Sequence, residues 1–206
     1  MPEFALLSYI ALMSITPGPN NLMLASSGVN FGFRRTLPHL LGISLGCALQ
    51  VFIVAALLAQ ALSWVASWRL PLAVAGCLYL LWLSWKIARA AQPRVREQAR
   101  PLGFVGAALF QWLNPKAWVM VLNASILFMP AGQGGRLAAA FLLALAFAVV
   151  NLPCISVWAW GGERLRRWLA SPRALLWYNL AMGGLMAATA LWLLCDELKP
   201  VLTKLA

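Results

Sequence analysis

Charged side chains are scarce in this sequence. Only 10% of its 206 residues are Asp, Glu, Lys or Arg and 63% are hydrophobic, whereas soluble domains have roughly 25% charged residues. Five residues are acidic, and none of them is clearly at the centre of an apolar run; they are Glu3, Glu97, Glu163, Asp196 and Glu197. The composition excludes a water-soluble protein and predicts an all-α, polytopic membrane protein.

Residues for metal, nucleotide and hydrolytic chemistry are also missing. The sequence has one histidine, His39, and no CxxC pair, HExxH, GxSxG, phosphate-binding loop or GxGxxG pattern. We therefore expect no metal, no cofactor, no catalytic residues and a function other than that of an enzyme. Cys47, Cys77, Cys154 and Cys195 lie inside apolar stretches, which is typical of buried thiols and not of a disulfide framework.

Basic residues outnumber acidic ones, and the formal net charge is +11. In a soluble protein this excess would suggest nucleic-acid binding, but here most Lys and Arg residues fall in the first, third and fifth loops between the apolar runs. Cytoplasmic loops carry the excess of Lys and Arg in membrane proteins. We therefore predict that these loops are cytoplasmic, that both termini lie outside, and that nucleic acid is not a partner.

Six apolar runs are long enough to cross a bilayer, which takes about 20 residues in a helix. They lie at about 4–27, 39–62, 70–90, 103–129, 136–160 and 174–197. The connections are short and are expected at 31–38, 63–69, 91–102, 130–135 and 161–173. The sequence thus predicts six transmembrane helices in a single transporter domain, residues 1–206.

Two of these runs are interrupted at corresponding depths. The first contains Thr16-Pro17-Gly18-Pro19-Asn20-Asn21, and the fourth contains Asn114-Pro115-Lys116. Proline removes a hydrogen-bond donor and clashes with the preceding turn, so carbonyls are freed where lipid cannot bind them. Residues 1–100 and 101–206 each hold three runs, and we interpret the two halves as repeats. Because three is an odd number, the second repeat crosses the membrane in the opposite sense. Paired breaks in an inverted repeat indicate a transporter's binding site at the midplane.

Residues at the two breaks are predicted to bind the substrate. They are Pro17, Gly18, Pro19, Asn20, Asn21, Asn114, Pro115 and Lys116, with Asn123 and Asn151 as further candidates. Inserting a lysine near the bilayer centre costs at least ~2.5–3.5 kcal/mol of free energy. We therefore expect Lys116 to have a binding partner or a function. Its ammonium would attract a substrate carboxylate, or lose its proton in coupling. Without carboxylates in the spans, the site should accept an anionic or zwitterionic solute.

Other interpretations remain open at this stage. Proline kinks can simply pack against neighbouring helices, and polar side chains can join helices, as in a membrane assembly protein without transport. Cys47 and Cys154 fall at similar predicted depths, which a transmembrane thiol oxidoreductase would need. Gln50 and Gln111 are weaker candidates for solute contact. Small residues in the second and sixth runs favour close helix packing; they are Gly42, Ser44, Gly46, Gly183, Gly184 and Ala188.

These motifs together resemble the LysE/RhtB family of bacterial amino-acid exporters. The matching residues are Thr16 to Asn21, Gly32-Phe33-Arg34, Gly42, Gly46, Leu113-Asn114-Pro115-Lys116-Ala117 and Gly183-Gly184. The resemblance implies secondary active export of amino acids or related small metabolites by a multi-pass inner-membrane protein, with protons as the coupling ion and lipid around it; it leaves a homodimer open. Family members that move lysine or arginine carry acidic residues in the spans. Their absence here favours the homoserine, threonine or leucine type.

Overall fold

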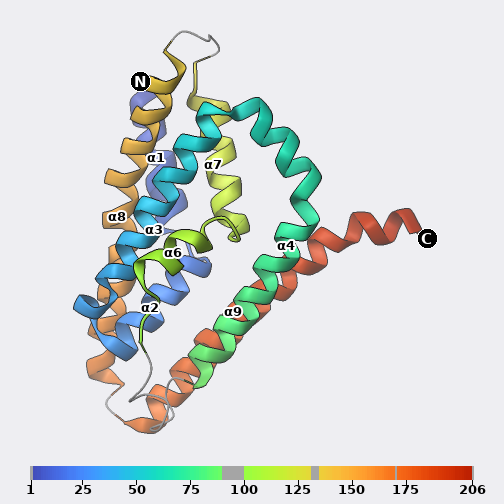
Figure 1. Ribbon diagram of the computed structural model, residues 1–206. Helices are drawn as coiled ribbons and strands as arrows, with labels where there is room; N and C mark the ends of the chain where they lie inside the picture. Colours follow the sequence, from blue (N-terminus) through green and yellow to red (C-terminus); the bar gives the residue numbers. More distant parts are fainter. Residues whose placement is uncertain (1, 90–99, 131–134, 170, 206) are drawn as a thin grey trace.

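The computed structural model describes residues 2–89, 100–130, 135–169 and 171–205, and over these ranges the chain is helical apart from short connections (Figure 1). The helices are α1 (Pro2–Ile15), α2 (Pro19–Phe31), α3 (Phe33–Ala56), α4 (Leu58–Arg89), α6 (Phe104–Phe110), α7 (Pro115–Phe128), α8 (Arg136–Trp168) and α9 (Pro172–Leu205). The prediction of an all-α fold is confirmed for the described residues. Within these described ranges, three stretches are long and apolar enough to cross a membrane, namely Phe33–Ala56, Arg136–Arg166 and Pro172–Cys195.

The first predicted connection, 31–38, contains the observed one but is longer than it, and the second is wrong in position. Between α2 and α3 the chain leaves the helix only at Gly32, whose φ of 85° suits glycine and allows a sharp turn without a longer loop. The second connection lies at Leu57, because residues 63–69 contain no glycine or proline and continue α4 as helix. Polar residues alone, therefore, did not mark the ends of these helices.

The fifth connection is shorter than predicted, because α8 continues through residues 161–168. Glycine costs a helix about 1 kcal/mol relative to alanine, yet Gly162 stays helical where α8 packs on α2. A Cβ on Gly162 would collide with the Ala25 carbonyl, and one on Gly28 of α2 would collide with the Ala159 carbonyl. Close packing thus explains this glycine inside α8. Parts of the predicted third and fourth connections, residues 91–99 and 131–134, lie outside the described residues.

The helices pack mainly between the two halves of the chain. α8 lies against α1, α2 and α3, and α3 in turn lies against α6 and α7 (Figure 1). α4 and α9 run along each other as a pair that leans away from the other helices (Figure 1). An apolar cluster joins this pair to α2 and α6; it consists of Leu22, Met23, Leu80, Leu83, Phe110, Met186 and Ala190.

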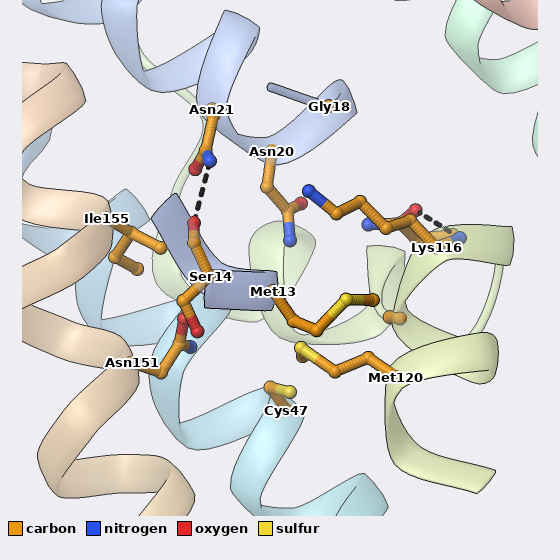
Figure 2. A pocket seen from close by; sticks show the side chains of 12 residues that line it. Met13, Ser14, Gly18, Asn20, Asn21, Cys47, Lys116, Met120, Asn151 and Ile155 are labelled. Carbon is orange, nitrogen blue, oxygen red and sulfur yellow. Dashed lines mark hydrogen bonds between the residues drawn. The ribbon is translucent and has the colours of Figure 1, made fainter. Parts of the chain in front are cut away.

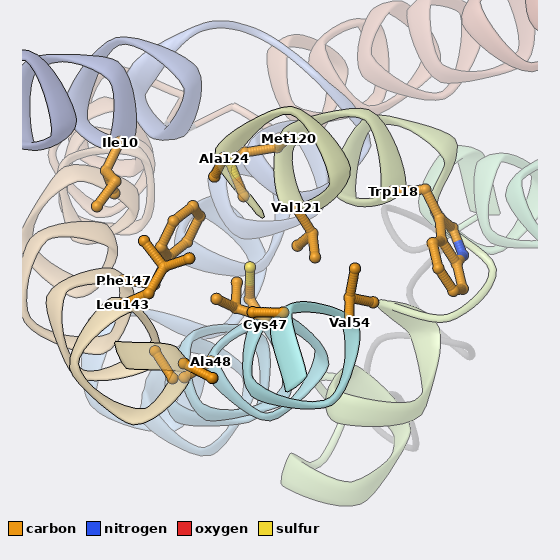
Figure 3. Packing of buried hydrophobic residues seen from close by; sticks show 14 residues of the cluster. Ile10, Cys47, Ala48, Val54, Trp118, Met120, Val121, Ala124, Leu143 and Phe147 are labelled. Carbon is orange, nitrogen blue, oxygen red and sulfur yellow. The ribbon is translucent and has the colours of Figure 1, made fainter. Parts of the chain in front are cut away.

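The largest buried apolar cluster combines α1, α3, α7 and α8 (Figure 3). Ile10, Val51, Val121 and Phe147 are fully buried in it, one from each of these helices. Outward-facing positions on α8 are also apolar and exposed, as at Phe141, which suits a surface in contact with lipid. Because this core needs helices from both halves, the space between the halves is the place where a site can form.

Small residues allow the close contacts of α3 with α6 and of α9 with α4. A Cβ on Gly42 or Gly46 would collide with α6, and one on Gly183 would lie 2.8 Å from a main-chain oxygen of α4. The packing role predicted for these three glycines is confirmed. Gly184 instead faces open space.

We predict that Gly46→Ala destabilises the folded protein by about 1–3 kcal/mol, the usual cost of overpacking a tight contact. The added Cβ would lie 2.6 Å from the Ala108 Cα, and backbone cannot move aside as a flexible side chain can. Thermal unfolding in detergent measures this effect. Gly184→Ala is the matched control and should unfold at or above the wild-type temperature. Equal unfolding temperatures for Gly46→Ala and the wild type would contradict the close approach of α3 and α6.

Candidate functional site

The first predicted break is present between α1 and α2. Thr16, Pro17 and Gly18 connect the two half-helices. Pro19 occupies the first turn of α2, where a missing N–H costs little, and Gly18 before it has a fully extended backbone. Carbonyl groups at the end of α1 and N–H groups at the start of α2 therefore lack partners within their own helices.

The second break lies between α6 and α7, at residues 111–114. Asn114 caps α7, since its side-chain oxygen accepts a hydrogen bond of 3.1 Å from the main-chain N–H of Lys116. Pro115 follows in the first turn of the helix. Asn-Pro is thus a strong local signal for a new helix, and it explains why α7 begins there in the middle of an apolar run.

Lys116 connects the two breaks. Its Nζ donates to the Thr16 main-chain oxygen at 2.8 Å, to Thr16 Oγ1 at 2.9 Å and to the Pro17 main-chain oxygen at 3.1 Å. These acceptors lie at the C-terminal end of α1, where the helix dipole favours a cation. All three partners are neutral, so the ammonium is hydrogen-bonded but has no carboxylate among these contacts.

Gly18 provides the space that the Lys116 side chain occupies. A Cβ built on Gly18 would lie 2.8 Å from Lys116 Cδ and 3.1 Å from its Nζ. A larger residue at this position would push the ammonium away from Thr16 and Pro17. Gly18 therefore has two roles: it is part of the first break, and it leaves room for the Lys116 side chain that connects the two breaks.

An amide network, buried at Gln50 and Gln111 and partly buried at Asn20, extends from the first break to α3 and the second break. Asn20 Nδ2 donates to Gln111 Oε1 at 2.9 Å, and Gln111 Nε2 donates to the main-chain oxygen of Ala107 at 2.8 Å. Gln50 of α3 donates to the main-chain oxygen of Gln111 at 3.3 Å. Sequence reasoning ranked Gln50 and Gln111 low. The sequence feature that could have identified Gln111 is its position at the second break, five residues before Lys116.

Asn21 connects the start of α2 to the end of α1. Its Nδ2 donates to the main-chain oxygens of Ser14 and Thr16, at 2.8 Å in each case. The remaining polar atoms of this corner, Asn21 Oδ1 and Ser14 Oγ, are buried without a hydrogen-bond partner. Sequence reasoning did not single out Ser14, because one serine in an apolar helix has no distinguishing pattern.

The two breaks border a pocket that also reaches α3 and α8 (Figure 2). Its lining residues are Met13, Ser14, Gly18, Asn20, Asn21, Cys47, Asn114, Lys116, Ala117, Met120, Asn151 and Ile155. The pocket holds about 350 Å³ of empty space, including its open mouth. Cys47 and Met120 lie across it from Asn21 (Figure 2), so one side is mainly polar and the other mainly apolar.

Most of the predicted binding residues border this pocket. Those in its lining are Gly18, Asn20, Asn21, Asn114, Lys116 and Asn151, whereas Pro17, Pro19, Pro115 and Asn123 are not. The three prolines shape the helix ends, and Pro17 also offers its carbonyl to Lys116. Asn123 is exposed on α7, two turns beyond Lys116, and α8 continues as helix through Asn151 and Pro153.

The two cysteines suggested for a thiol relay differ in their surroundings. Cys47 is buried and lines the pocket, whereas Cys154 is only partly buried and is not in the lining. Both thiols are free. The geometry therefore gives the pocket one thiol and no adjacent second one among its lining residues, which does not favour a relay.

Known proteins resemble the chain over most of its length. The family model described as LysE type translocator matches residues 11–197. A cysteine/O-acetylserine efflux protein from Klebsiella pneumoniae is 31% identical over 182 residues, which cover 86% of this chain and 91% of the relative. Proteins of the same name from Escherichia coli and Shigella flexneri are each 30% identical over 168 residues, covering 78% of this chain and 82% of each relative. No solved structure was found to match.

The matched residues include both breaks, Lys116 and every residue that lines the pocket. The family match and the apolar helices together identify a multi-pass protein of the bacterial inner membrane. The resemblance seen in the motifs is confirmed, and the chain belongs to the LysE type translocator family.

Proposed function

We propose that this protein is a secondary active exporter of neutral, zwitterionic amino acids or related small metabolites. The observation that carries the proposal is the Lys116 ammonium at the pocket wall, whose hydrogen bonds within the described residues all go to neutral oxygens of Thr16 and Pro17. A substrate carboxylate is a stronger acceptor for an ammonium than a carbonyl is. Substrate binding would therefore replace contacts at the end of α1 with an ion pair.

The pocket favours a short, uncharged substrate side chain. Met13, Cys47, Met120 and Ile155 form its apolar part, and its lining contains no Asp or Glu to receive a second positive charge. Cysteine and O-acetylserine, in the names of the similar efflux proteins, are small neutral amino acids. These names support the neutral class and, within it, substrates of the cysteine type beside the homoserine, threonine and leucine types expected from the sequence.

We further propose a single transporter domain of two inverted repeats and six membrane spans. Each repeat would begin with a broken span, α1 with α2 and α6 with α7, followed by two long helices. The packing supports this pairing, since α8 contacts α1 and α2 as α3 contacts α6 and α7. The junction of α2 with α3, the end of α8 and the start of α9 lie toward the lower end of the bundle (Figure 1), which supports a common cytoplasmic side.

We propose that alternating access occurs by a rocking movement of one repeat against the other. The hydrogen bonds from Lys116 to Thr16 and Pro17 cross between the repeats. These hydrogen bonds would hold the pocket closed when it is empty. They would break, and the pocket would open, when a substrate carboxylate binds the ammonium. Protons are the proposed coupling ion, and Lys116 is the cationic side chain in the lining that can release one.

Lys116→Met is predicted to abolish export while leaving the protein in the membrane, because the neutral side chain cannot bind a carboxylate. Release of labelled neutral amino acids from proteoliposomes, with the amount of inserted protein measured in parallel, checks this outcome. The matched control is Lys86→Met, which removes an exposed lysine that contacts the Trp82 ring on α4 and should export normally. Near-normal export by Lys116→Met would refute the assignment.

Lys116→Arg is predicted to separate binding from coupling. The guanidinium still attracts a carboxylate but cannot be deprotonated in proteins, so substrate binding should stay within about tenfold of wild type. A pH gradient should no longer drive accumulation in vesicles, although exchange of labelled for unlabelled amino acid continues. Accumulation driven as strongly as in the wild type would show that the proton is carried elsewhere.

A further inference from the structure

Two polar atoms in the pocket wall lack a partner. Ser14 and Asn21 are only 5% and 3% exposed, and neither Ser14 Oγ nor Asn21 Oδ1 makes a hydrogen bond. Leaving such a group unpaired costs about 1–3 kcal/mol, and buried polar groups are normally paired. Both residues line the pocket (Figure 2), so a group bound in the pocket is the candidate partner for these two atoms.

The orientation of the Asn21 amide fixes which kind of partner is missing. Its Nδ2 donates to two main-chain oxygens, those of Ser14 and Thr16. A rotated amide would place Oδ1 against both of these oxygens, which cannot donate. Oδ1 is therefore the free atom, and it needs a donor. The Ser14 hydroxyl can also accept a hydrogen bond.

The electrostatics of this corner suit a cationic donor. Ser14 lies in the last turn of α1, at the negative end of the helix dipole. Lys116 lies on the other side of Asn20 from Asn21 (Figure 2). The polar part of the pocket therefore has a positive group at one end and unpaired acceptors at the other, as a zwitterion requires.

We propose that Ser14 and Asn21 form the subsite for the α-ammonium group of the exported amino acid, with the carboxylate directed to Lys116. Asn151, which also lines the pocket, contributes an amide from α8. This inference rests on the proposed function. It adds a basis for specificity: an acid without the ammonium leaves both acceptors unpaired, and a site built to hydrogen-bond a group rejects the analogue that lacks it.

Ser14→Ala tests the subsite, because no described hydrogen bond involves the hydroxyl that it removes. Ser26→Ala is a matched control, since Ser26 Oγ is also buried and unpaired but lies outside the pocket lining. Wild-type proteoliposomes are first assayed for exchange of cysteine, O-acetylserine, homoserine, threonine and leucine. The best substrate becomes the probe, and its deamino acid becomes the competitor; for cysteine this competitor is 3-mercaptopropionate.

In Ser14→Ala the half-saturating concentration of the amino acid should rise about tenfold, because one hydrogen bond to a charged group is lost. Competition by the deamino acid should not change, and Ser26→Ala should match the wild type for both ligands. Unchanged affinity for the amino acid, or an equal loss for both ligands, would overturn the subsite. If Ser14→Ala does not fold, Ser14→Cys provides the same comparison with nearly the same shape.

Failure of the proposed function gives a different result. Wild-type vesicles that exchange none of the five amino acids would contradict amino-acid export itself, and the subsite with it. Exchange by the wild type together with an unaltered preference in Ser14→Ala would contradict the subsite alone.

Discussion

The structure depends on the three hydrogen bonds from the Lys116 ammonium to the end of α1. The Lys116 side chain is half-buried, and a cation in an apolar span needs oxygen acceptors, whereas a continuous helix would use its own carbonyls. Pro17, Gly18 and Pro19 end α1 and free those carbonyls. The break and the lysine are therefore mutually required: without the break Lys116 has no acceptors, and without Lys116 the carbonyls of Thr16 and Pro17 lose their donor.

This contact also sets where the two halves of the chain meet. α1 belongs to the first half and Lys116 to the second, so each of these hydrogen bonds crosses between them. The same holds for the amides of Asn20 and Gln111 and for the apolar core around Val51 and Val121. A site placed between the halves is one that a relative movement of the halves can open and close.

The breaks and their positions were predictable because proline acts locally. Pro17, Pro19 and Pro115 end or begin helices whatever the surroundings. The connection at 63–69 was predicted wrongly because this stretch has no glycine or proline to end the helix. The one at 161–173 was predicted too long because Gly162 packs on α2 and stays helical. Three features depend on contacts between distant segments, which one sequence does not reveal: the hydrogen bonds of Gln111, the unpaired Ser14 hydroxyl and the position of Asn123 outside the pocket lining.

The most direct measurement is the ¹⁵N resonance of the Lys116 side chain in lysine-labelled protein, assigned by comparison with Lys116→Arg. Saturation with a transported amino acid should shift this resonance, because the ammonium exchanges carbonyl partners for a carboxylate. The corresponding amino alcohol, which lacks the carboxylate, should not shift it. A resonance that stays in place while the amino acid is shown to bind would contradict the role of Lys116 as the carboxylate partner.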